Sequence, residues 1–373
     1  MIYFDNAATT ITKPDCVINA DKYALSHLCA NAGRGSHSSS IKAATLLFEA
    51  RKAVKKLTYC DDVAFTFNCT DALNTVLFGT AKKGGHVITT IYEHNSTLRP
   101  LEELGRRMGV TYTAVRPNSH GIIDPADIER AIKPNTYLIA VNHASNVTGA
   151  VAPVTQIGGI ARRHSILFLI DGAQSVGYLD VNMREIGCNF LCFAPHKGLH
   201  GPQGIGCLCV RGNPQLAPLR YGGTGTQSHS LYQPTDFPEG FESGTLPVHS
   251  IFALIAAINH NLNLSLATRR NLAHCGDLLK NELGKLPNVK IYGKYNTLPN
   301  IISFNVNGMN AAPVGDILND QYDIAVRCGL QCAPLCHKFL GTLDRGVVRV
   351  SLSYDNNVGE VEFFLKAMHE ICK

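Results

Sequence analysis

Short runs rich in β-branched and aromatic residues alternate along the chain with longer stretches whose apolar residues recur at helical spacing. The runs that we predict as strands are 63–67, 86–89, 110–115, 137–141, 166–170 and 190–193. Alternation of strands with helices is typical of a mainly parallel sheet. The pattern therefore predicts an α/β fold in which helices cover both faces of such a sheet.

The pattern changes beyond about residue 265. A helical stretch after Pro247 reaches Leu266 and is followed by a helix, by strands near 301–306 and 347–353, and by a terminal helix that begins with Asn357 and Glu360 at capping-box spacing. This predicts a large domain, 15–265, and a small α+β domain, 266–373. Within the large domain, an early helix is predicted from an apolar stripe of Ile41, Ala44, Leu47, Phe48, Val54 and Leu57.

Composition narrows the class of protein. With 373 residues, 45% of them hydrophobic and 17% charged, the chain is long enough for a large core and two domains. No secretory signal or membrane-spanning stretch is recognisable, and thirteen cysteines, an odd number scattered through apolar runs, indicate reduced thiols. We therefore expect a cytoplasmic protein that does not bind membranes. The modest net charge of +5, without a cluster of lysines and arginines, argues against a nucleic-acid partner.

Two apolar runs end in residues that carry chemistry. The run at 190–193 leads to Lys197, and the run at 166–170 ends at Asp171. A lysine beside a buried strand loses charge by desolvation and becomes nucleophilic toward an aldehyde, although the same lysine could simply extend to water. Ligands collect at the carboxyl ends of strands in open α/β sheets, so Asp171 and Lys197 could face one ligand. Pyridoxal phosphate needs such a pair, because a lysine binds its aldehyde and a carboxylate keeps its ring nitrogen protonated.

Several motifs surround these two residues. Asp171-Gly-Ala-Gln174 and His196-Lys197-Gly198 are accompanied by the segments 3–10, 31–37, 93–96, 145–149, 201–206, 241–245 and 327–334. Together they resemble the class V aminotransferase family, in its cysteine desulfurase branch, almost from end to end. The resemblance implies a fold type I transferase that depends on pyridoxal 5′-phosphate, with a seven-stranded type of sheet. It also implies a homodimer and an N-terminal segment, 1–14, that packs near the active site.

The cofactor phosphate is expected at a helix start. Residues 68–72 follow a strand and open a helix, where free backbone N–H groups favour an anion. The resemblance assigns the phosphate contacts to the backbone of Cys69, to Thr70, to His196 and, across the dimer interface, to Thr245. Ala194 stands where the family usually has Ser or Thr, so we expect one hydroxyl contact to be lost.

The cofactor ring has its own expected partners. By resemblance, His94 stacks on the ring and can relay protons, whereas Asn146 and Gln174 hydrogen-bond its phenolic oxygen. An isolated histidine is more often structural, and only the motif that contains His94 assigns it to the site.

Three cysteines, Cys328, Cys332 and Cys336, are spaced four residues apart and are followed by His337. On one helix face they could bind zinc or an iron–sulfur cluster. Gly329 and Pro334 argue against such a helix, so no metal site is expected. The segment resembles the family's catalytic loop, which makes Cys332 the acceptor of substrate sulfur. Its distance of 17 residues from Arg349 resembles the branch with a compact loop, which often needs a partner protein as sulfur acceptor.

Two arginines are candidates for the substrate carboxylate. Arg349 lies in a valine-rich run, where a buried arginine needs an anion, and it matches the arginine that binds this group in the family. Arg327 is a second candidate. Arg34 and His37 lie on a loop that we expect at the rim of the site, with roles left open.

The resemblance implies a cysteine desulfurase that converts L-cysteine to L-alanine and leaves the sulfur as a persulfide on Cys332, with Lys197 moving the α-proton. Selenocysteine lyase and an aminotransferase on a small substrate remain open within the same cofactor class. A non-enzymatic sulfur carrier or metal-binding scaffold built on the three cysteines is the alternative of another class.

Overall fold

A seven-stranded sheet forms the centre of the computed structural model, which describes residues 1–33 and 35–373. Its strands run in the order β2-β8-β7-β6-β5-β3-β4, and β4, β3, β5, β6 and β7 pair in parallel. The predicted mainly parallel sheet is therefore confirmed. The strand bounds are β2 (Asp62–Thr66), β3 (His86–Thr90), β4 (Thr111–Val115), β5 (Thr136–Asn142), β6 (Leu167–Asp171), β7 (Phe190–Phe193) and β8 (Gly206–Val210).

Strand β8 is absent from the sequence prediction. It pairs antiparallel with both β7 and β2. The segment between β7 and β8 contains no helix, so the chain turns back instead of crossing over to another parallel position. That returning segment carries Lys197.

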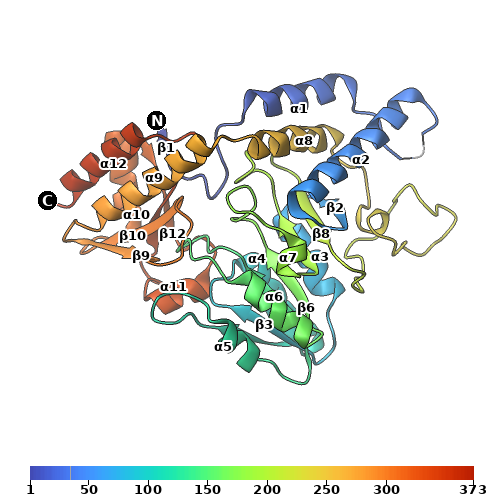
Figure 1. Cartoon of the computed structure of the whole chain (residues 1–373), viewed down its shortest axis with the longest axis horizontal. Coiled ribbons are helices and arrows are strands. Elements are labelled where there is room, and N and C mark those ends of the chain that lie inside the picture. The colour runs from blue at the N-terminus through green and yellow to red at the C-terminus, as the bar shows by residue number, and fades with distance from the viewer. Residues whose placement is uncertain (34) are drawn as a thin grey trace.

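Helices cover both faces of this sheet (Figure 1). Apolar residues of α2, α5, α6, α7 and α8 pack on one face, and those of α3 and α4 pack on the other. Side chains alternate along the strands accordingly: Phe168 and Ile170 of β6 face the first layer, and Leu169 faces the second. The helix bounds are α1 (Asp15–His27), α2 (Ser38–Thr58), α3 (Cys69–Gly79), α4 (Asn95–Met108), α5 (Pro125–Arg130), α6 (Val154–Arg163), α7 (Met183–Ile186) and α8 (Val248–Leu262), with a short 3₁₀ helix at Glu239–Phe241.

The apolar stripe predicted for α2 is partly wrong. Leu47 and Val54 are buried, but Ile41, Ala44 and Phe48 are exposed. The row that packs inward is Ala43, Leu46, Leu47, Ala50 and Val54, and its alanines allow close approach to the neighbouring helix α8. The three exposed positions therefore lie on a face that this chain alone leaves uncovered.

The C-terminal part of the chain contains a second, antiparallel sheet in the order β12-β13-β10-β9. Strand β1, at the start of the chain, pairs with β11 beside it, and Phe4 packs in the hydrophobic core formed with these C-terminal elements. As predicted, Asn357 and Glu360 form a capping box at the start of α12. The bounds are β1 (Ile2–Tyr3), β9 (Val289–Tyr292), β10 (Ile301–Val306), β11 (Ile324–Ala325), β12 (Arg327–Gly329), β13 (Val347–Ser351), α9 (Leu266–Leu283), α10 (Ala311–Tyr322), α11 (Pro334–Leu340) and α12 (Val358–Ile371).

The helix predicted to continue from Pro247 to Leu266 is two helices. Helix α8 ends at Leu262, and α9 begins at Leu266 with Ser265 as its N-cap. The two axes differ by 83°. Among the described residues, no single helix has both the length and the apolar content of a membrane span; α8 and α9 meet that criterion only as this bent pair.

Candidate active site

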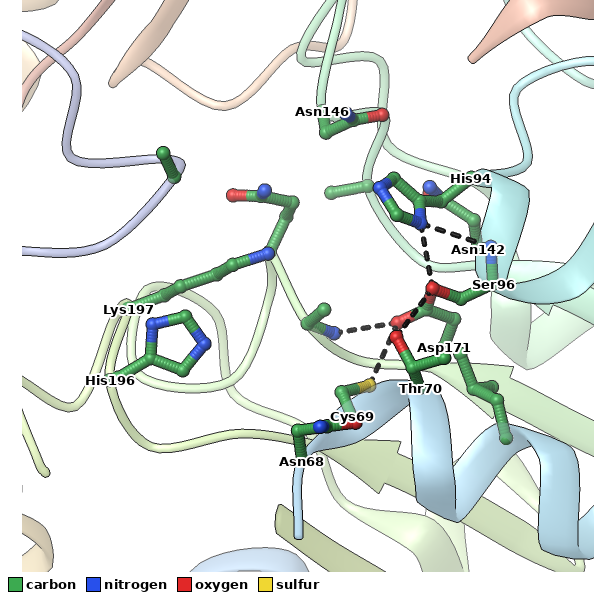
Figure 2. A pocket seen from close by; sticks show the side chains of 15 residues that line it. Asn68, Cys69, Thr70, His94, Ser96, Asn142, Asn146, Asp171, His196 and Lys197 are labelled. Atoms are coloured by element: carbon green, nitrogen blue, oxygen red, sulfur yellow. Dashed lines mark hydrogen bonds between the residues drawn. The ribbon is translucent and has the colours of Figure 1, made fainter. Parts of the chain in front are cut away.

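A cavity of about 180 Å³ lies where the carboxyl ends of β5 and β6 meet the first residues of α3 and α4 (Figure 2). This is the edge at which open α/β sheets bind ligands. Eight predicted site residues line the cavity together: Cys69, Thr70, His94, Asn146, Asp171, Gln174, His196 and Lys197. Four others do not line it, namely Cys332, Arg349, Arg327 and Thr245.

Lys197 is held by close backbone packing on either side. A Cβ atom on Gly198 would lie 2.4 Å from the Val176 carbonyl oxygen, so only glycine fits directly after the lysine. The carbonyl of His196 accepts hydrogen bonds from Thr10 N at 3.0 Å and from Thr9 Oγ1 at 3.2 Å. Burial lowers the pKa of Lys197, although Cys69 and Asp171 act in the opposite direction. The backbone that carries the amine is thus fixed, and the amine is less strongly protonated than that of an exposed lysine.

Asp171 is the last residue of β6 and is buried. Its Oδ1 atom accepts a hydrogen bond from Ala173 N at 2.9 Å and another from Cys69 Sγ at 3.6 Å. These contacts fix the carboxylate at the cavity wall.

His94 is held as a neutral imidazole. It caps helix α4, and its Nδ1 atom accepts from Ser96 N at 3.1 Å and lies 2.8 Å from Ser96 Oγ. Because Nδ1 is an acceptor, the ring proton is on Nε2. Burial lowers the pKa of His94, and the positive end of the helix dipole also disfavours the imidazolium. Ser96, which also lies 2.7 Å from Thr70 Oγ1, is a site residue that the sequence reasoning missed.

The start of α3 offers an anion site in the cavity. Asn68 caps the helix by accepting from Asp71 N at 2.9 Å, and Asn68, Cys69 and Thr70 all line the cavity. Gly206 permits this arrangement, since a Cβ atom there would lie 2.4 Å from the Asn68 carbonyl carbon. The first N–H groups of such a helix lack intrahelical acceptors and favour a phosphate.

The polar atoms around the cavity fit pyridoxal phosphate. Among the described residues, His196 Nδ1, Asn146 Oδ1 and Gln174 Oε1 are buried and have no hydrogen-bond partner. Buried polar atoms normally have partners, so these three atoms are free to bind polar groups placed in the cavity. Burial also lowers the pKa of His196 to about 4, which keeps this side chain neutral. The lysine amine, the buried carboxylate and the helix start are the three groups that the cofactor's aldehyde, ring nitrogen and phosphate require.

The Cys332 loop is attached to the cavity residues. Asn95 N donates to the Cys332 carbonyl at 2.7 Å, and Asn146 Nδ2 donates to the Gln331 carbonyl at 2.6 Å. Gln331 and Cys332 both have positive φ angles, 42° and 56°, which cost about 1–2 kcal/mol each in a non-glycine residue. His337 contacts Gln331 Oε1 at 3.2 Å and thereby supports this conformation. Cys332 is consequently presented at the surface while its backbone is held.

The other two cysteines of this segment are in different structural settings. Cys328 lies on β12 and Cys336 on α11, so the three do not share one helix face. Burial raises the pKa of Cys328 to about 11 and that of Cys336 to about 12, which keeps both as thiols. The arrangement does not support the metal-cluster alternative.

The two arginines are joined by a residue to which the sequence reasoning gave no role. Asp5 Oδ1 accepts from Arg349 Nη2 at 2.8 Å, and its carboxylate also accepts from Arg327 Nε at 3.0 and 3.1 Å. Arg349 is buried, donates to the Asn146 carbonyl at 2.9 Å, and leaves its Nε without a partner among the described residues. Two guanidinium groups and one carboxylate leave one positive charge for another anion. Asp5 belongs to the motif at 3–10, so the sequence could have indicated a role for it in the site.

The remaining predicted positions lie elsewhere. Thr245 is exposed and lines a second cavity of about 650 Å³, together with Phe48 of α2. His37 caps α2, Ala194 is buried, and Arg34 lies outside the described residues. Asn142, at the end of β5, lines the Lys197 cavity and was missed, although its place at a strand end could have indicated it.

Comparison with known proteins identifies the family to which this fold and site belong. The family model described as aminotransferase class-V matches residues 2–364. The chain belongs to the class V aminotransferase family.

Relatives within this family share a narrower name. A protein of Methanothermobacter thermautotrophicus, named probable cysteine desulfurase, is 35% identical over 383 residues, covering 99% of this chain and 94% of its own. One of Pyrococcus abyssi with the same name is 33% identical over 386 residues, covering 100% and 94%. The apo structure of a cysteine desulfurase from Thermococcus onnurineus matches with a TM-score of 0.93 and 34% identity, covering 100% and 94%.

Glu93 is a buried carboxyl group next to the site. Its Oε1 atom accepts from Thr90 Oγ1 at 2.8 Å and from Asn142 N at 3.0 Å, and its Oε2 atom has no partner among the described residues. Burial raises the pKa of Glu93 from 4.5 to about 8. The folded chain therefore keeps this proton at pH values where the unfolded chain has lost it.

We predict that Glu93 makes the protein less stable as the pH rises. Between about pH 4.5 and pH 8 the folded state binds the extra proton, so the free energy of unfolding falls with increasing pH in this window. The side chain of Glu93→Gln cannot ionise. Its free energy of unfolding, relative to that of the wild type, should therefore rise by more than about 1.4 kcal/mol between these two pH values. Urea unfolding across this range checks the prediction, with exposed Glu362→Gln as control. Parallel curves for wild type and Glu93→Gln would contradict it.

Proposed function

We propose that the chain is a pyridoxal-phosphate-dependent cysteine desulfurase that converts L-cysteine to L-alanine and transfers the sulfur to Cys332. The observation that carries the proposal is the connection of the Cys332 loop, through Asn146 and Asn95, to a cavity lined by Lys197, Asp171 and His94. The names of relatives that match the chain over nearly its full length support the substrate.

Each part of the cofactor has a candidate partner in the cavity. Cys69 and Thr70, by their backbone, and His196 would hold the phosphate; Asp171 would hold the protonated ring nitrogen; Asn146 and Gln174 would contact the phenolic oxygen. When bound, pyridoxal phosphate supplies an electron sink for the substrate α-carbon. His94 is neutral and caps α4, so its ring can lie against the cofactor without adding a charge.

The chain's own residues can perform the remaining steps. Arg349 binds the substrate carboxylate, for which its unpartnered Nε is available. Lys197 would hold the cofactor through its aldehyde and, as a free amine after the substrate amine has taken its place, would move the α-proton. The Cys332 thiolate attacks the substrate sulfur, a new S–S bond forms as the C–S bond breaks, and the remaining carbon is protonated to give alanine. The products are L-alanine and a Cys332 persulfide, without any net oxidation or reduction.

The proposal extends to the assembly. We propose a homodimer in which Thr245 reaches the phosphate site of the partner subunit, because Thr245 is exposed and lines a cavity separate from that of Lys197. Exposed Ile41, Phe48, Leu231 and Tyr232 would supply the apolar contact surface. We further propose that the chain divides into domains at residues 14 and 265 and that the protein is cytoplasmic. A separate protein would accept the sulfur of the Cys332 persulfide. Thirteen cysteines, all free, support a reducing compartment.

Lys197→Ala should lose the visible absorbance of bound cofactor that borohydride bleaches, together with all turnover, because its desolvated amine is the one at the cavity wall. Lys13→Ala is the matched control. Lys13 is another lysine with a lowered pKa, about 8, but its Nζ is bound to Thr10 at 2.6 and 2.8 Å. Spectra before and after borohydride check the prediction. A bleachable band that is retained in Lys197→Ala would overturn the assignment. Loss of the band in Lys13→Ala would then assign the cofactor to Lys13.

Cys332→Ala should bind cofactor and L-cysteine with spectra like those of the wild type but form no protein persulfide, because the loop then has no thiolate. Persulfide labelling and mass spectrometry, with alanine and sulfide measured in parallel, check this. Cys328→Ala and Cys336→Ala should keep most of the activity. Loss in all three variants with release of a metal would favour the cluster alternative, and transamination products would favour an aminotransferase.

Mixed dimers test the position of Thr245. Thr245→Ala and Lys197→Ala should each be impaired alone, whereas subunit exchange between them should restore native sites, about a quarter of the total for random exchange. Each mixed dimer then has one site with both native residues, provided that Thr245 acts on the partner. Activity after exchange, with sedimentation velocity to confirm the dimer, is the measurement. No restoration would place Thr245 in the site of its own chain.

A further inference from the structure

The side chain of Cys69 has a contact that its expected backbone role does not explain. Cys69 is the first residue of α3, and its Sγ atom lies 3.6 Å from Asp171 Oδ1 (Figure 2). The residue is half-buried and lines the cavity. A thiol thus contacts the carboxylate that would hold the cofactor's ring nitrogen.

The contact has a defined direction. Burial raises the pKa of the Cys69 thiol well above 9.0, and the charge of Asp171 raises it further. A thiolate here would place two negative charges in contact. The sulfur therefore keeps its proton and donates a hydrogen bond to the carboxylate. The titratable groups around the thiol are Asp171 on β6, Cys192 on β7 and Lys197 on the following loop. Cys69 is therefore a poor nucleophile and a suitable donor.

The two protein contacts of Asp171 fall on one oxygen. Ala173 N and Cys69 Sγ both donate to Oδ1, at 2.9 and 3.6 Å. Oδ2 receives no hydrogen bond from the described residues, and the residue lines the cavity. The backbone donor fixes Oδ1 from the β6 side and the thiol fixes it from α3, so the carboxylate plane is set and its other oxygen is left for a ligand.

We propose that the Cys69 thiol is a positioning residue, which orients Asp171 and stabilises its ionised form for the ring nitrogen of pyridoxal phosphate. The proposal rests on the proposed cofactor and adds a side-chain role at a position otherwise assigned to the backbone. Hydrogen bonds to a carboxylate favour its ionised form, and a thiol is a weak donor. Its loss should therefore leave the Asp171 carboxylate less firmly oriented and its negative charge less stabilised.

The first test detects the hydrogen bond in the full-length protein without using activity. The infrared difference between wild type and Cys69→Ala isolates the S–H stretching band of Cys69, and donation to a carboxylate lowers its frequency. Asp171→Asn should move this band toward the frequency of a free thiol, because the charged acceptor is lost. A Cys69 band that is already at the free-thiol frequency, or that does not respond to Asp171→Asn, overturns the proposal.

The second test measures the consequence for the cofactor. Binding of pyridoxal phosphate to the cofactor-depleted full chain should weaken on the acid side, and this acid limb should lie at higher pH in Cys69→Ala than in the wild type. Cys69→Ser keeps a donor and should retain the wild-type limb. Cys192→Ala, which removes the neighbouring thiol opposite Asp171 in the sheet, should also retain it.

The outcomes of the two tests are separable. An acid limb that is unchanged in Cys69→Ala, or shifted equally in Cys69→Ser, overturns the positioning role even where the infrared band moves. Failure of the wild-type protein to bind pyridoxal phosphate would instead overturn the proposed function. The infrared test would still decide whether the thiol donates to Asp171.

Discussion

The parallel pairing of β5, β6 and β7 is the constraint on which the site depends. Their register places Asn142 opposite Asp171, and Asp171 opposite Cys192, so the carboxyl ends of the strands meet at one edge. The antiparallel strand β8 then requires the chain to turn back directly after β7, and this turn carries Lys197. The carboxylate and the amine therefore lie on one cavity because of strand direction, although 26 positions separate them in the chain.

Burial in a low-dielectric environment strengthens the electrostatic interactions of Asp171 and Lys197 with their neighbours. Around Asp171, burial keeps Glu93 and Cys69 protonated and His94 neutral. If ionised, Glu93 and Cys69 would repel the carboxylate and His94 would pair with it, because Coulomb interactions are weakly screened in the interior. Two neutral donors, the Ala173 N–H and the Cys69 thiol, instead orient the carboxylate, and burial lowers the pKa of the nearby Lys197.

The N-terminal segment connects the C-terminal strands with the cavity. Strand β1 pairs with β11, Asp5 binds both Arg327 and Arg349, and the carbonyl of Ala7 accepts from Gln174 Nε2 at 2.9 Å. A buried arginine without a counterion is costly, so the ion pair with Asp5 allows Arg349 to be buried beside Asn146. Residues from opposite ends of the chain thus form one charged cluster.

The sequence alone determined the strand-helix alternation, the capping box at Asn357 and the pairing of strand ends with Asp171 and Lys197, because these depend on local periodicity and on the direction of neighbouring strands. The motifs also identified eight residues that share one cavity. Only the tertiary structure decided which face of α2 is buried, that the stretch after Pro247 bends by 83°, and that β8 is antiparallel. It alone joined Asp5 to Arg349, Ser96 to His94 and the Cys69 thiol to Asp171. Such contacts depend on side-chain directions and on packing between distant segments, which no local pattern encodes.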